Sequence, residues 1–124
     1  MQRTILLVQL AVLTALATVH IIALANDLYW LFPSLDLLTH FLGGVWSALF
    51  FYWVMIASSR SPSVLSIIAY VLVLGVAWEV FELTVGISAG AHYARDTLSD
   101  LFMDFVGACV VVFALRYFFA DMRV

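Results

Sequence analysis

Residues 64–85 of the chain read VLSIIAYVLVLGVAWEVFELTV, an apolar run in which the only charged side chains are Glu79 and Glu82. A membrane-spanning helix needs about 20 mostly apolar residues. Three further runs meet this requirement, at about residues 4–25, 36–57 and 97–119. Polar or turn-forming segments separate them. The sequence therefore predicts an all-α protein, a four-transmembrane-helix bundle that forms a single integral membrane domain over residues 1–124.

The composition excludes other broad classes of protein. Of the 124 residues, 66% are hydrophobic and 10% are charged, whereas soluble domains average about 45–50% apolar and about 25% charged residues. A disordered chain would be poorer in hydrophobic residues and richer in charge. Five arginines, no lysine and a net charge of −3 argue against binding to nucleic acid. The single cysteine, Cys109, excludes an internal disulfide and a multi-cysteine zinc site.

The ends of the first run leave two interpretations open. Arg3 resembles the short positively charged start of a signal peptide, and Ala23-Leu24-Ala25 resembles a cleavage site with small residues at its first and third positions. The run of about 20 apolar residues is longer than the usual core of about 7–15 residues in such a peptide, so we expect a true first helix. Orientation follows from the arginines, because cytoplasmic loops are enriched in positive charge. Four of the five arginines fall on one side of the predicted bundle, namely Arg3, Arg60, Arg116 and Arg123, and only Arg95 falls on the other side. This distribution predicts that both termini are cytoplasmic.

Six of the eight acids lie within the apolar runs or at their ends, which is costly in a membrane. Insertion of one charged residue at the centre of a helix costs about 2.5–3.5 kcal/mol. Such residues usually mark ion or substrate paths, proton relays or buried pairs. At about 100° per residue, the acids and small residues form one stripe on each of the last three helices. The stripes are Asp36, His40, Gly43 and Ser47; Gly75, Glu79, Glu82 and Gly86; and Asp96, Asp100, Asp104 and Gly107.

We expect the three stripes to meet in the outer half of the bundle, since polar faces turn away from lipid. His20 is a further candidate for this cluster, and Arg95 is its one basic partner. A bound divalent cation would supply the missing positive charge; the alternative is that several acids are protonated. Oxygen ligands with a histidine favour Mg, Mn, Ca or Fe ions over structural zinc. The candidate ligands are Asp36, His40, Glu79, Glu82, Asp96, Asp100 and Asp104.

Some of these residues also have simpler interpretations. Asp36 and Asp96 each begin a predicted helix, where aspartate is a favoured N-cap. His40 is compatible with an ordinary buried histidine, and Glu82 with a solvated position near the interface. Asp100, Asp104 and Glu79 lie a turn or more inside their helices, so capping and solvation do not explain them.

Three motifs together resemble a known family. They are Asp36-Leu-Leu-Thr-His40-Phe-Leu-Gly-Gly, Trp78-Glu79-Val-Phe-Glu82 and the segment from Arg95-Asp96 through Asp100 and Asp104 to Gly107-Ala108. This pattern, over about residues 36–108, resembles the VanZ-like and, more closely, the YjdF-like small membrane proteins. The resemblance implies a multi-pass protein of the bacterial or archaeal cytoplasmic (inner) membrane. The VanZ name is tied to glycopeptide (teicoplanin) resistance. VanZ-like proteins usually have Asn where Asp104 stands, so this chain has an additional acid.

Three functions are compatible with the pattern. The first is metal-dependent action on a lipid-linked or envelope substrate, with Glu82 or Asp96 as candidate general base. The second is proton or cation handling, by one copy of the chain or by a homo-oligomer. The inner half of the predicted helices has no charged side chains, which argues against a complete conduit within one copy. The third is a non-catalytic accessory subunit of a larger membrane complex. The sequence predicts a site and does not name a reaction or a substrate.

Overall fold

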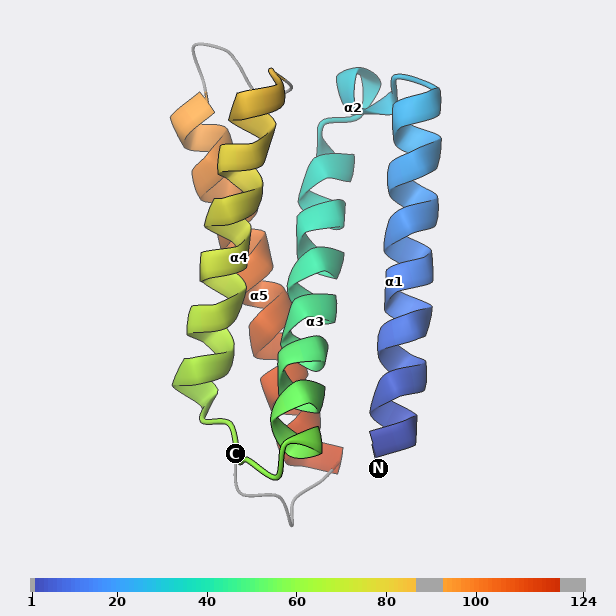
Figure 1. Ribbon diagram of the computed structural model, residues 1–124. Helices are drawn as coiled ribbons and strands as arrows, with labels where there is room; N and C mark the ends of the chain where they lie inside the picture. Colours follow the sequence, from blue (N-terminus) through green and yellow to red (C-terminus); the bar gives the residue numbers. More distant parts are fainter. Residues whose placement is uncertain (1, 87–92, 119–124) are drawn as a thin grey trace.

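The computed structural model describes residues 2–86 and 93–118, and their regular structure is entirely helical. Four of its helices are long and apolar enough to cross a membrane, which confirms the predicted four-helix architecture. The elements are α1 (Gln2–Ala25), α2 (Leu28–Leu31), α3 (Ser34–Ala57), α4 (Val64–Val85) and α5 (Tyr93–Phe118). In Figure 1, α1, α3 and α4 run side by side, and α5 crosses obliquely behind α4 and α3.

The helix boundaries follow local capping chemistry. α4 spans the predicted residues 64–85, because the Ser63 side chain accepts a hydrogen bond from the Ser66 amide and Gly86 ends the helix at a left-handed φ of 75°. α3 begins at Ser34 rather than at residue 36, directly after Pro33, whose φ of −56° already suits a helix. The predicted starts at residues 4 and 97 are also late, since α1 begins at Gln2 and α5 at Tyr93.

The short helix α2 was not predicted. It forms a single turn between α1 and α3, at the end of the bundle where α1 ends and α3 begins (Figure 1). Asp27 precedes it in a left-handed conformation with φ of 52°, which the short polar side chain of aspartate tolerates. Trp30 is 87% exposed in this turn, a position typical of an aromatic side chain at a membrane interface.

Helix α3 is the centre of the bundle. It packs against α1, α4 and α5, whereas the main chain of α1 lies close to neither α4 nor α5 among the described residues. The most deeply buried side chains of this core include Ala48 and Tyr52 of α3, Ile67 and Val71 of α4 and Ala108 of α5. The main chains of α3, α4 and α5 thus pack closely together, whereas a gap separates the main chains of α1 and α4, which the ring contact between His20 and Trp78 bridges.

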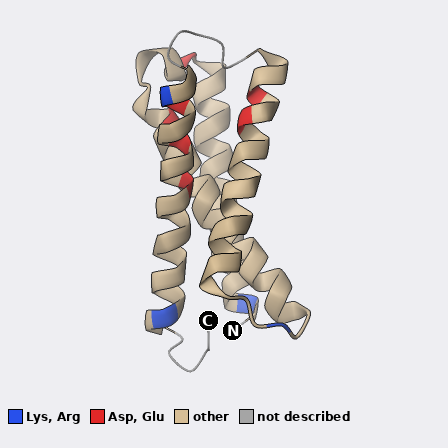
Figure 2. Ribbon diagram, turned by 90° about the vertical axis from the view of Figure 1, so that its left-hand side faces the viewer, with Lys and Arg blue, Asp and Glu red and all other residues tan. Residues whose placement is uncertain are grey.

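Charged residues are separated along the length of the bundle. Figure 2 shows the acids of the described residues towards one end, together with one basic position, and the remaining basic positions at the other end. This matches the distribution expected from the sequence for Arg3, Arg60, Arg95 and Arg116. Phe119, Asp121 and Arg123 lie outside the described residues.

Two glycines permit the close approach of α3 and α5. A Cβ atom added at Gly44 would collide with the main chain of Asp104, and one added at Gly107 would collide with the main chain around Phe41 and Val45. Small residues are the usual means by which membrane helices come this close. The contact places Asp104 directly against α3, where His40 also lies.

We predict that Gly44→Ala destabilises the bundle, because the new methyl group meets main-chain atoms that cannot rotate away. Overpacking of this kind costs about 1–3 kcal/mol. The matched control is Gly43→Ala, since a Cβ at Gly43 has its nearest neighbour at an ordinary 3.9 Å. Thermal unfolding in a mild detergent should show a lower midpoint for Gly44→Ala alone. Equal midpoints for the two variants would contradict the packing described for α3 and α5.

Candidate metal centre

His40 lies at the centre of a cluster of carboxylates contributed by three helices. Its Nε2 atom is 3.7 Å from Oε1 of Glu79 and 4.0 Å from Oδ1 of Asp36, and its Nδ1 atom is 3.5 Å from Oδ2 of Asp104. The imidazole is buried, with 6% of its surface exposed. Asp36 and His40 are four residues apart on α3, and Asp100 and Asp104 are four apart on α5, so each pair shares a helix face.

The two nitrogens of His40 have different surroundings. Nδ1 faces Asp104 within hydrogen-bonding distance. Nε2 faces Asp36 and Glu79, at separations longer than a normal hydrogen bond. In metal sites, a ligating histidine typically directs its second ring N–H to a carboxylate, which orients the ring. Asp104 is placed to serve this purpose, with Nε2 left to face a cation.

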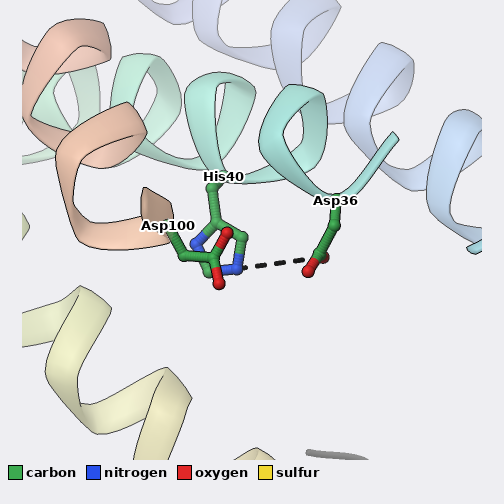
Figure 3. Close-up of side chains that lie close together, drawn as sticks. All are labelled: Asp36, His40 and Asp100. Atoms are coloured by element: carbon green, nitrogen blue, oxygen red, sulfur yellow. Dashed lines mark ion pairs between the residues drawn. The ribbon is translucent and has the colours of Figure 1, made fainter. Parts of the chain in front are cut away.

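Asp36, His40 and Asp100 form the tightest group of potential ligands. One ligand atom from each lies within 4.8 Å of the others. Figure 3 shows the three side chains gathered where α3 faces α5. Around an octahedral ion with bonds of about 2.1 Å, ligand atoms are about 3–4 Å apart. Small side-chain rotations would therefore bring these three atoms to coordination distance.

Two carboxylate oxygens of the cluster are buried without a hydrogen-bond partner among the described residues. They are Oδ1 of Asp100 and Oε1 of Glu79, and each residue is only 3% exposed. The other oxygen of Glu79 accepts a hydrogen bond of 2.7 Å from the Thr97 hydroxyl. A buried polar atom without a partner carries a large desolvation cost. Both oxygens therefore mark a place where a positively charged group would be strongly stabilised.

The structure brings together five of the seven predicted ligands: Asp36, His40, Glu79, Asp100 and Asp104. The other two lie apart from this group. The Asp96 side chain is exposed. Glu82 accepts a hydrogen bond of 3.0 Å from the indole nitrogen of Trp78 and lines the adjoining cavity.

His20, the further candidate from α1, lies beside the cluster and bonds elsewhere. Its Nδ1 shares a hydrogen bond of 2.7 Å with the Tyr29 hydroxyl, and its ring packs edge-on against Trp78. Burial raises the pKa of the Tyr29 phenol above 10.0, and the charges of Asp36 and Glu82 act in the same direction. The phenol is therefore protonated at neutral pH. The hydrogen bond between His20 and Tyr29 therefore joins α1 to α2.

Sequence reasoning missed Thr97 and Tyr29 as partners of the candidate residues. The sequence contained a signal for Thr97, because this residue is three positions before Asp100 and therefore shares the acidic face of α5. Tyr29 had no such signal, since its partner His20 is in another helix and the short helix α2 that carries Tyr29 was not predicted within the turn-forming segment.

A cavity of about 510 Å³ adjoins the cluster between α1, α3 and α4. Asp36, His40 and Asp104 are among the residues that line it. Its sides are formed mainly by apolar residues of α1 and α4, two helices whose main chains do not approach each other closely. The candidate centre thus has access to the space between these helices.

The fold and the site define the class of protein: a multi-pass membrane protein with a buried carboxylate–histidine cluster in one half of its bundle. Comparison with family models gives the family. Residues 3–121 match the model described as "Predicted membrane protein (DUF2238)", and the chain belongs to this family. Neither the search of curated proteins nor that of solved structures finds a match to the chain.

Proposed function

We propose that the cluster around His40 binds a divalent cation. Asp36, His40 and Asp100 would be its ligands and Asp104 would orient the imidazole. Glu79 lies beside this group, with Oε1 3.7 Å from Nε2 of His40. The observation that carries the proposal is the pair of buried carboxylate oxygens without partners, on Asp100 and Glu79. A cation beside either oxygen would supply the partner that it lacks.

The donor set narrows the choice of ion. Carboxylate oxygens and one imidazole nitrogen suit Mg, Mn, Ca or Fe ions, whereas structural zinc sites draw on cysteine. Two aspartates with a neutral histidine balance the charge of one divalent ion. Cys109, the single cysteine, is not among the grouped ligands.

The role we propose for the ion is in metal-dependent action on a lipid-linked or envelope substrate. The support is positional, because the cluster opens into a cavity between two helices that face lipid. Glu82 lines the same cavity and is the better candidate for the general base, whereas the Asp96 side chain is exposed. The Trp78 hydrogen bond would hold the Glu82 carboxylate in place.

Two other functions have weaker support. A cation path would need polar groups through the inner half, but there the core of the described helices is formed by Ile67, Val71, Val111 and Leu115. A non-catalytic accessory subunit fits the small size of the chain; nothing in the described residues points to a particular partner. Either function would replace the enzymatic one if the cluster held no metal.

We also propose that the chain is related most closely to the YjdF-like branch of the VanZ-like proteins, and that it lies in a bacterial or archaeal cytoplasmic membrane. The support is the Asp36…His40 motif of α3 and the aspartate-rich start of α5. Both termini would be cytoplasmic, which places the cluster in the outer half of the membrane.

Loss of the Asp100 carboxylate should abolish metal binding. We predict that wild-type protein purified in mild detergent without chelator retains metal in a near-stoichiometric amount, and that Asp100→Asn loses most of it while still inserting. Elemental analysis measures both. Asp96→Asn is the matched control, four residues earlier on the same helix but exposed. Equal metal content in wild type and Asp100→Asn would exclude Asp100 as a ligand.

Asp104 should act through His40 rather than on the ion. Removal of a carboxylate that orients a metal-bound histidine typically lowers metal affinity about 10–100-fold. We therefore expect Asp104→Asn to bind Mn²⁺ with weakened affinity but unchanged stoichiometry at saturation, as measured by titration calorimetry. A complete loss of binding at saturating Mn²⁺ would instead make Asp104 a direct ligand.

The proposed orientation predicts which loops are accessible from outside the cell. In a Cys109→Ser background, a cysteine placed at Asn26 should react with a membrane-impermeant maleimide in intact cells. A cysteine placed at Ser61 should react only after the membrane is disrupted. The reverse pattern would put the cluster on the cytoplasmic side.

A further inference from the structure

The cavity beside the cluster has the length of one membrane leaflet. On α3 it extends from Asp36 to Ser47, and on α4 from Glu82 to Val71. Eleven residues of helix rise about 16 Å, and half of the hydrocarbon core of a bilayer is about 15 Å. The cavity therefore reaches from the outer interface to about the middle of the membrane.

The polarity of the cavity changes along this length. Its outer end contains His20, Asp36, His40 and Glu82, and its inner end is lined by apolar side chains that include Leu13 and Val71. Ser47, also at the inner end, is already satisfied, because its hydroxyl donates to the Gly43 carbonyl at 2.7 Å. A polar head above an apolar chain is the shape of a membrane lipid.

The cavity is also reachable from the bilayer. The main chains of α1 and α4 stay apart, and the ring contact between His20 and Trp78 lies at the polar end of the cavity. Towards the other end, side chains on both sides of the gap are exposed, with Leu13 37% and Leu74 40% exposed. The volume of about 510 Å³ is within the range of small-molecule sites, which is about 300–1,000 Å³.

The candidate metal centre provides the reason for a lipid head to bind there. Asp36, His40 and Asp100 supply three ligand atoms, whereas Mg²⁺ prefers about six oxygen ligands and is often held by one or two carboxylates together with phosphate. Asp36 and His40 line the cavity. The coordination positions of the cation that these three residues do not fill would therefore face the outer end of the cavity.

We propose that this cavity binds one acyl chain of a phospholipid from the outer leaflet, with an oxygen of the lipid phosphate as a ligand of the cation. The contact between the lipid phosphate and the cation rests on the proposed function above. It makes phospholipids the substrate class of the candidate metal centre. The chain occupies the gap between α1 and α4, and the head lies at the level of Asp36 and His40.

The test uses Ala17 and Ala15 of α1. Both are exposed alanines at nearly the same depth, and only Ala17 lines the cavity. A tryptophan at position 17 fills the space for the acyl chain, whereas one at position 15 does not. The probe is phosphatidylglycerol with a diazirine on one acyl chain, in nanodiscs of unlabelled lipid, with full-length protein loaded with Mn²⁺.

We expect photolabelling of wild-type protein to map to the cavity side chains of α1 and α4. Ala17→Trp should lower this labelling severalfold, Ala15→Trp should not, and removal of Mn²⁺ by chelation should lower it in wild type. Equal labelling in the two variants would overturn the chain site. Labelling that depends on Ala17 but ignores chelation would overturn the contact between phosphate and cation.

Metal content and oligomeric state are measured on the same samples. Ala17→Trp should retain Mn²⁺, so that a loss of lipid is separated from a loss of the ion. Wild-type protein that binds no Mn²⁺ would contradict the proposed function itself. A wild-type dimer that Ala17→Trp dissociates would place a second copy of the chain in the gap and overturn the lipid proposal.

Discussion

Carboxylates within membrane-spanning helices are stable only where protein surrounds them, and this constraint determines which faces of α3, α4 and α5 meet. Glu79, Asp100 and Asp104 are each almost fully buried although they belong to mostly apolar helices. The apolar side chains of these helices alone would allow many rotations about the helix axes. Their common neighbour is the His40 imidazole, which contacts Glu79 and Asp104 directly. The rotation of each helix about its axis follows from this convergence.

The glycines make the convergence possible. Gly44 and Gly107 allow the main chains of α3 and α5 to approach, and Gly75 of α4 leaves space that the Asp104 carboxylate occupies. A side chain at any of the three positions would meet atoms of the opposing helix. The small-residue stripe and the acidic stripe are therefore two parts of one arrangement, in which close backbones shield charged side chains from lipid.

The helices and most of the cluster could be predicted because both depend on local pattern. Apolar length defines α4 to the residue, and helical spacing alone places Asp100 and Asp104 on one face. Other features depend on contacts between helices, which the spacing of residues along the sequence does not predict. The exposure of Asp96, the bond between Thr97 and Glu79 and the gap between α1 and α4 belong to this group. Asp96 shares the angle of Asp100 but lies one turn nearer the helix end, beyond the cover of α3 and α4.

The central claim is that the His40 imidazole holds a divalent cation, and a nitrogen–metal contact is its most specific consequence. Pulsed electron paramagnetic resonance of Mn²⁺-loaded protein measures it directly through the coupling of the manganese electrons to a nearby nitrogen nucleus. The account predicts a histidine nitrogen coupling in wild-type protein that disappears in His40→Gln. Bound Mn²⁺ without nitrogen coupling, or the same coupling in both proteins, would contradict it.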